Sequence, residues 1–245
     1  MRARFLGTGA SGGTPGRGRS QRMESSLLVR ERDTALLIDV TRHFDRQAAR
    51  IETIDAVLLT HAHRDASGGL AQLRRWCAAR GVEAIPVHAA PATFRALRRR
   101  FARLDYCRFV ALGEGSAVRI GPFTVTATTV PHAREADVPT YGYRVQSRGA
   151  LVYASDVAEL TSDLRAACEG ARTLVIDGAM WGRRLFSHLT IDAELEELCR
   201  WPPRDIVLTQ IGRTAPPHET LAREVARRCA RARPAYDGLE IEIGR

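Results

Sequence analysis

The sequence predicts an α+β fold in which two packed β-sheets lie between outer helices, a four-layer αββα arrangement. Three observations support this prediction: strand-like runs outnumber helical ones, the strands mix hairpins with strand–helix steps, and no repeat or linker divides the 245 residues. The length alone allows one large or two small domains. Because Pro and Gly are spread evenly along the chain, we expect a single domain over residues 1–245.

Strands are predicted where apolar and β-branched residues form short runs, and helices where apolar residues recur three and four apart. The first part of the chain should form strands at 3–6, 26–30, 35–39, 56–60 and 85–88, with helices at 70–80 and around Phe94. The middle should form strands at 117–120, 123–129, 142–146 and 150–154. The last part should form strands at 173–177, 205–209 and 239–243, with helices at 191–200 and 218–233.

The composition is that of a folded globular protein and excludes several function classes. With 44% hydrophobic and 27% charged residues, the chain is neither disordered nor fibrous. No apolar run reaches the length of a membrane span, and MRARFLGTGASGG lacks the apolar core of a signal peptide. Five spread cysteines without a CxxC pair predict reduced thiols. We therefore expect a cytoplasmic protein with no membrane partner.

A net charge of +9 is consistent with an anionic partner, but the residue usage weakens the case for nucleic acid. All 37 basic residues are arginine, and the chain contains neither lysine nor asparagine, as a GC-rich coding bias would produce. The densest run, residues 98–100, falls on a predicted amphipathic helix, so we expect these arginines to face solvent. A small anionic substrate is favoured over nucleic acid.

The strongest chemical signal is LLTHAHRDASGGL, residues 58–70. His61 and His63 follow an apolar strand at i and i+2, with Asp65 two residues further on. In an extended segment, side chains two apart point the same way, so both imidazoles can face one point in space. Two imidazoles and a carboxylate suit zinc, although manganese and iron also accept them. The metal interpretation is favoured over a surface loop that carries two histidines by chance.

Two further candidates, His132 and Asp156, each follow an apolar run and lie near a predicted strand end, where loops gather to form sites. Taken alone, a histidine at such a position is as often a hydrogen-bonded core residue as it is a metal ligand. In the company of His61 and His63, however, His132 is better interpreted as a metal ligand.

These residues carry a resemblance to the metallo-β-lactamase superfamily, whose signature is HxHxDH after a strand. The opening of its phosphodiesterase branch, which includes tRNA 3′-processing endonucleases and phosphoribosyl cyclic phosphate phosphodiesterases, is similar to LGTGASGGTP (6–15), SSLLV (25–29) and LLIDV (36–40). Later motifs of the branch are similar, in the same order, to VPHAREADVPTYGYRV (130–145), LVYASD (151–156), SHLT (187–190) and VLTQIGR (207–213). The resemblance implies the αββα sandwich and a histidine, His188, that meets the substrate phosphate. The metal ligands that it implies are His61, His63, His132 and Asp156.

The second metal site of the family is altered in this chain. Ala66 stands where HxHxDH ends in histidine, and Gln210 stands where a late strand ends in Thr-His. Both lost histidines belong to the second site, whereas the first-site residues are all present. We therefore expect one tightly bound ion per chain, with a second site that is absent or weak. The residues left to such a weak site are Asp65, Asp156 and Gln210.

One ion is enough for hydrolysis, because zinc lowers the pKa of its bound water from 15.7 to about 7. Asp65 is a candidate to orient that water or accept its proton. Alternatively, Asp65 fixes a histidine tautomer from outside the ligand set. His188 is a candidate to contact the substrate phosphate or protonate the leaving oxygen, unless SHLT only begins a helix that Thr190 caps.

Residues 7–12 match GxGxxG after a strand, but the TPG that follows cannot readily open a helix, as a dinucleotide site requires. A tight turn beside the active site is the better interpretation, with Gly12 and Gly13 as substrate-binding candidates. Three arginines, which either guide an anionic substrate or lie in solvent, follow at Arg17, Arg19 and Arg22.

We expect a metal-dependent hydrolase, and the resemblance favours a phosphodiesterase that acts on a small cyclic phosphate or nucleotide through a metal-activated water. The alternatives are a mononuclear hydrolase of thioesters or lactones and a non-catalytic metal-binding protein. The segment between His132 and Asp156 is too short for the arm with which tRNA-processing members of the family grip RNA. Members of the family often dimerise, so a homodimer is an open alternative.

Overall fold

Residues 1–132 and 138–244 are described by a computed structural model, in which the strands form two seven-stranded sheets. In spatial order, the first sheet contains β14 (Glu240–Glu242), β1 (Arg2–Gly7), β2 (Ser26–Glu31), β3 (Thr34–Ile38), β4 (Ala56–Leu58), β5 (Ile85–Ala89) and β6 (Cys107–Ala111). The second contains β13 (Ala232–Pro234), β12 (Asp205–Thr209), β11 (Thr173–Asp177), β10 (Ala150–Ala154), β9 (Thr140–Gln146), β8 (Phe123–Val130) and β7 (Ala117–Ile120). Part of the family-like segment 130–145, residues 133–137, lies outside the described residues.

Each sheet combines an antiparallel part with a parallel part. Strands β14 to β3 of the first sheet and β7 to β10 of the second pair antiparallel, and the remaining neighbours pair parallel. Parallel neighbours need a crossover connection, which explains the positions of the helices. The crossovers contain α1 (Phe44–Gln47), η2 (Ala48–Arg50), α2 (Arg64–Ser67), α3 (Leu70–Ala78), α4 (Pro91–Arg100), α5 (Ser162–Ala167), α6 (Ile191–Leu198) and α7 (His218–Arg228). A short 3-10 turn, η1 (Gly18–Ser20), precedes β2.

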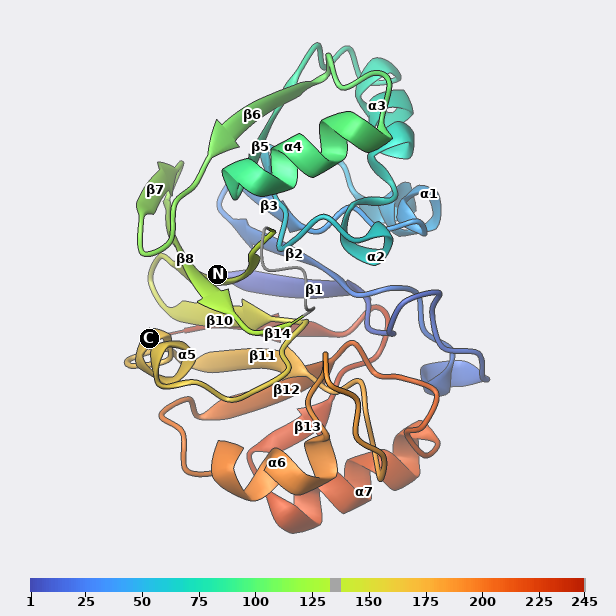
Figure 1. Ribbon diagram of the computed structural model, residues 1–245, viewed down its shortest axis with the longest axis vertical. Helices are drawn as coiled ribbons and strands as arrows, with labels where there is room; N and C mark the ends of the chain where they lie inside the picture. The colour runs from blue at the N-terminus through green and yellow to red at the C-terminus, as the bar shows by residue number, and fades with distance from the viewer. Residues whose placement is uncertain (133–137, 245) are drawn as a thin grey trace.

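Three buried apolar clusters separate the four layers. One lies between the sheets and includes Phe5 and Tyr143. The second lies between the first sheet and its helices and includes Trp76, and the third lies between the second sheet and its helices and includes Val225. Figure 1 shows α3 and α4 on one side of the stacked sheets and α6 and α7 on the other. The predicted αββα sandwich is therefore confirmed.

The differences from the predicted elements concern short segments and element ends. The sequence patterns do not predict α1, α2, α5, β6 or β13. The three helices have four to six residues, which are too few to show a helical period. The helix expected over 218–233 ends at Arg228. Arg231 then donates to the carbonyls of Pro203 and Trp201, at 2.7 and 3.1 Å, and the chain turns into β13.

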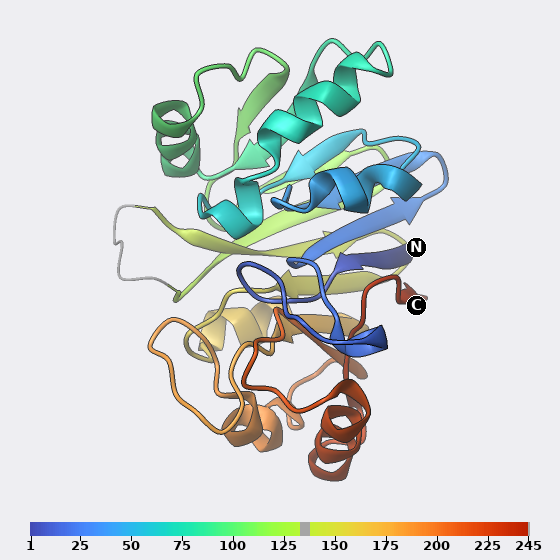
Figure 2. The same cartoon turned by 90° about the vertical axis from the view of Figure 1, so that its right-hand side faces the viewer.

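The segments that carry the candidate residues meet at one edge between the two sheets. Gly9, after β1, pairs with Ile211, after β12. Figure 2 faces this edge, where the dark blue segment after β1 crosses the middle of the molecule and the orange segment after β11 lies on the lower half. All five cysteines carry free thiols, as predicted. Among the described residues, no helix has the length and apolar character needed to cross a membrane.

Candidate metal centre

The two histidines of the HAH sequence lie in a short irregular segment between β4 and α2. Tyr141 of β9 donates its backbone N–H to the Thr60 carbonyl at 2.9 Å. From the other side, Arg100 of α4 donates to the Ala62 carbonyl at 2.6 Å. Arg100 is thus held against this segment, whereas its helical pattern predicts a solvated position. These contacts hold the HAH segment on two sides.

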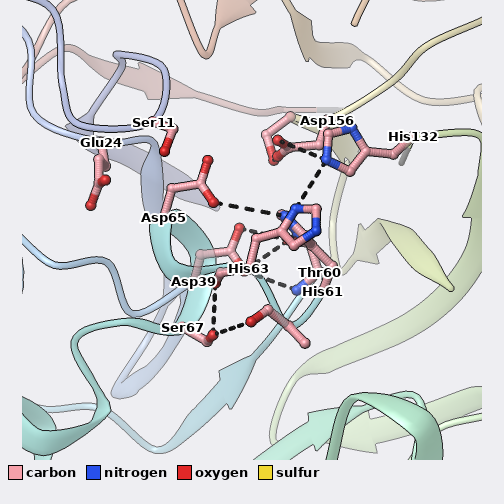
Figure 3. A network of polar contacts seen from close by, with 12 residues as sticks. Ser11, Glu24, Asp39, Thr60, His61, His63, Asp65, Ser67, His132 and Asp156 are labelled. Atoms are coloured by element: carbon pink, nitrogen blue, oxygen red, sulfur yellow. Dashed lines mark hydrogen bonds and ion pairs between the residues drawn. The ribbon is translucent and has the colours of Figure 1, made fainter. Parts of the chain in front are cut away.

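Three imidazoles and one carboxylate converge at this edge (Figure 3). The ring centroids of His61 and His63 are 4.6 Å apart, and that of His132 lies 5.1 and 5.3 Å from them. One ring nitrogen from each histidine lies within 4.8 Å of the others. His132 Nε2 also lies 3.9 Å from Oδ1 of Asp156. The structure therefore brings together the four residues that the sequence predicts as ligands of the first metal.

The side chains at this point fit a zinc ion. Nε2 of His61 is buried and makes no hydrogen bond to any described residue. This is unusual for a buried ring nitrogen and is expected of a nitrogen that binds a metal ion. Burial lowers the pKa of His61 to about 3. The ring is therefore neutral at physiological pH, as metal binding requires. Three imidazoles with an adjoining carboxylate are a donor set typical of zinc.

Hydrogen bonds orient two of the imidazoles. The Thr60 hydroxyl lies 2.8 Å from His61 Nδ1 and 3.0 Å from both carboxylate oxygens of Asp39. Because the hydroxyl donates its proton to Asp39, its oxygen accepts one from His61 Nδ1. Nδ1 of His132 lies 2.7 Å from the Ser187 carbonyl, which can only accept. Both rings thus carry their proton on Nδ1 and present the lone pair of Nε2 to the centre.

A Thr60→Val substitution tests this orientation, because it removes the hydroxyl while keeping the shape. We expect the zinc affinity to fall by about 10- to 100-fold, since the His61 ring is no longer held in one tautomer. Competition with a chromophoric chelator measures the affinity. Thr93→Val is the matched control, because Thr93 is a buried threonine whose hydroxyl has no partner among the described residues. Equal zinc affinities of Thr60→Val and the unmodified protein would contradict the expectation.

Asp65, Asp156 and Gln210, which the sequence assigns to a weak second site, also lie together. Nε2 of Gln210 is 2.7 Å from Oδ1 of Asp156 and 3.3 Å from Oδ2 of Asp65. Oδ1 of Asp65 lies 3.9 Å from His61 Nε2. Burial raises the pKa of Asp65 to about 6, close to what a general base needs near neutral pH. Burial also acts to raise the pKa of Asp156, but the neighbouring imidazoles together outweigh burial and lower it.

His188 lies beside the three imidazoles and pairs with a carboxylate. Its ring centroid is 4.9 Å from that of His132, and its Nδ1 is 2.6 Å from Oδ2 of the buried Asp177 at the end of β11. Burial acts to lower the pKa of His188, but Asp177 outweighs it and raises the pKa to about 9. Thr190 precedes α6 without a side-chain cap, and its hydroxyl donates to the backbone carbonyl of Arg183 instead. The structure therefore supports a site position for His188 over the helix-cap alternative.

The glycine segment forms a tight turn and opens no helix, as predicted. Gly12 and Gly13 have φ angles of 85° and 75°, a region that few other residues adopt. The Gly12 N–H donates to Oε1 of the buried Glu24 at 2.8 Å, so this amide is already engaged, and substrate contacts at either glycine stay a prediction. Arg22 is buried and donates to the Ala235 carbonyl. It therefore supports the fold, and the suggestion that it guides a substrate is wrong.

Glu24, which no sequence motif singles out, holds the glycine turn against the segment after β3. Besides Gly12, it accepts hydrogen bonds from the backbone N–H and the Nε of Arg42, at 2.9 and 2.8 Å. Glu24→Ala leaves these donors unsatisfied, so we expect a loss of about 2 kcal/mol in the free energy of unfolding. Urea unfolding measures it, with Glu196→Ala on the exposed face of α6 as the control. A loss no larger than that of the control would contradict this role.

Comparison with protein-family models matches residues 36–211 to the beta-lactamase superfamily domain. An octanoyltransferase of Porphyromonas gingivalis is 27% identical over 99% of this chain and 52% of its own length. A ribonuclease Z of Bradyrhizobium diazoefficiens is 31% identical over 58% of this chain and 49% of its own length. This chain thus spans about half the length of these curated relatives.

Solved structures are similar over nearly the whole chain. A diphosphatase from the PhnP family superposes with a TM-score of 0.87 at 25% identity, covering 99% of this chain and 97% of that one. Zn²⁺-bound PqqB from Methylobacterium extorquens superposes with a TM-score of 0.84 at 22% identity, covering 99% of this chain and all of that one. The short form of human tRNase Z superposes with a TM-score of 0.70 at 18% identity, covering all of this chain and all of that one. The chain therefore belongs to the beta-lactamase superfamily and has the metallo-β-lactamase fold.

Proposed function

We propose that this chain is a cytoplasmic phosphodiesterase that holds one zinc ion tightly and hydrolyses a small anionic phosphodiester, such as a cyclic phosphate or a nucleotide. The observation that carries the proposal is the convergence of His61, His63 and His132 beside the pair of His188 and Asp177. The buried Nε2 of His61 has no hydrogen-bond partner among the described residues. The similarity to the PhnP-family diphosphatase and to ribonuclease Z supports the choice of a phosphorus ester. A small substrate is favoured over nucleic acid.

Different residues of the site carry out the two proton transfers of the proposed reaction. When bound, zinc supplies a water with a pKa near 7 and a positive charge beside the phosphoryl group. Asp65 accepts a proton from the attacking water as the water oxygen bonds to phosphorus. His188, which Asp177 keeps protonated, donates its proton to the leaving oxygen as the phosphorus–oxygen bond breaks.

The test is a joint measurement of metal content and turnover on protein purified without added metal. We expect one zinc ion per chain by elemental analysis, and hydrolysis of bis(p-nitrophenyl) phosphate and of cyclic nucleotides. A chelator should abolish this turnover, and zinc should restore it. Manganese or iron in place of zinc would correct the identity of the metal. Bound metal without turnover on any ester would indicate a non-catalytic metal-binding protein instead.

The octanoyltransferase that aligns with 99% of this chain favours a second candidate, hydrolysis of an acyl bond such as a thioester. The same residues serve this reaction, with Asp65 accepting the water proton and His188 donating to the leaving group. The discriminating quantity is kcat/KM for a cyclic nucleotide against that for an octanoyl thioester. A value that is larger for the thioester would replace the phosphodiesterase proposal with this one.

A further inference from the structure

The side chain of Gln210 lies where two carboxylates of the site approach each other. Its Nε2 donates to Oδ1 of Asp156 at 2.7 Å and to Oδ2 of Asp65 at 3.3 Å, so both of its N–H groups have acceptors. Gln210 and Asp156 are only 2% and 3% exposed. One neutral amide group therefore connects two acidic side chains that are largely shielded from water.

The backbone of Gln210 is held in a conformation that aims this side chain. Its φ is 56°, in the left-handed region, which is uncommon for a residue with a side chain and persists where the surroundings enforce it. The Gln210 N–H donates to the Ser25 hydroxyl at 2.8 Å, and that hydroxyl lies 2.9 Å from the Thr209 hydroxyl. The next residue, Ile211, donates its N–H to the Thr8 carbonyl at 2.8 Å. Gln210 is thus fixed between β12 and the segments next to β1 and β2.

Two carboxylates brought together in a buried site need a shared cation or a shared donor, because their charges otherwise repel. The amide of Gln210 is such a donor. Turning the amide over would place its oxygen against both carboxylates, so the hydrogen-bond network itself fixes which end faces them. The amide nitrogen that faces them has no lone pair to offer a metal. Ala66, which is buried, contributes only a methyl group.

We propose that the amide of Gln210 takes the place of a second metal ion, so that the centre is mononuclear and Asp65 stays free of metal as the proton acceptor. This inference rests on the proposed function for the role of Asp65. It replaces the expectation of a weak second site, because the group between the two carboxylates is a hydrogen-bond donor and not a ligand. Asp156 then connects Gln210 with the histidine cluster, because its Oδ1 lies 2.7 Å from Nε2 of Gln210 and 3.9 Å from Nε2 of His132.

The experiment measures zinc per chain by elemental analysis after equilibration with excess zinc and removal of free ion. We expect one zinc in the unmodified protein and two in the Ala66→His, Gln210→His double variant, which exchanges the donor for ligands. Gln146→His, at the exposed C-terminal end of β9, adds a histidine away from the site, and this variant should still bind one zinc. Circular dichroism confirms that each variant is folded.

Two zinc ions in the unmodified protein would overturn the proposal whether or not the variants fold. A folded double variant that stays at one zinc would also overturn it. The zinc counts do not depend on turnover. If the unmodified protein binds one zinc but hydrolyses no ester, the proposed function fails while the mononuclear centre stands.

Discussion

The His61→Ala variant is expected to lose tight zinc binding and at least about 10³-fold of its phosphodiester turnover, because without zinc the pKa of the attacking water returns from about 7 toward 15.7. His61 supplies a buried Nε2 that has no hydrogen-bond partner in the part of the chain that the structure describes. Its removal leaves two imidazoles, His63 and His132, beside the carboxylate of Asp156, so the centre loses one of its four converging donors. Elemental analysis and steady-state assays measure the two losses on the same preparation.

A second buried histidine provides the control for this experiment. His218 of α7 is 6% exposed, and its Nδ1 lies 3.0 Å from a guanidinium nitrogen of Arg22. His218→Gln keeps a hydrogen-bond acceptor there, so zinc content and turnover should match those of the unmodified protein. If His61→Ala retains one tightly bound zinc, His61 is not a ligand and the metal centre is wrongly placed.

The His188→Gln variant is expected to lower kcat for a cyclic nucleotide by about 10²- to 10⁴-fold, which is the usual contribution of a general acid. Glutamine can still donate a hydrogen bond to Asp177 but has no proton to transfer. Zinc content should stay at one ion, since His188 acts on the leaving group in the proposed reaction. KM should change little, which separates a loss of proton transfer from a loss of substrate binding.

The choice of leaving group sharpens this second test. A p-nitrophenolate leaves without protonation far more easily than an alkoxide, so His188→Gln should lose less turnover on bis(p-nitrophenyl) phosphate than on the cyclic nucleotide. Asp177→Asn should also lose less turnover on bis(p-nitrophenyl) phosphate than on the cyclic nucleotide, because it removes the charge that keeps His188 protonated. Both losses should be smaller than those of His188→Gln. Equal losses on both substrates would show that His188 does not protonate the leaving group.

Much of the fold could be predicted from the sequence because its strands and longer helices carry local periods. The exceptions have physical causes. Strand β10 buries every residue, so it shows a continuous apolar run without alternation and is found by its composition. The arginine run on α4 follows a helical period, yet Arg100 turns back to the Ala62 carbonyl. A period assigns a residue to a face of its own helix but does not say which neighbouring segment packs on that face.

The residues that orient the site were harder to predict than those that form its centre. Asp39, Thr60 and Asp177 each end an apolar strand run, in LLID, LLT and LVID. That common position is a usable signal, because strand ends meet at the site edge. It is shared with strand ends that have no such role, so the sequence alone does not separate these three residues from the others.

The sequence by itself determined the family, the layered fold and the candidate ligands His61, His63, His132 and Asp156, because the motif HAHRD is contiguous and the runs around it keep their order along the chain. It also showed which two histidines of the family are replaced. Only the tertiary structure showed which side chains the replacement residue Gln210 contacts. The contacts of Gln210 with Asp156 and Asp65 join residues 54 and 145 positions apart. Contacts between such distant positions arise when the two sheets pack together, and no local period or motif encodes them.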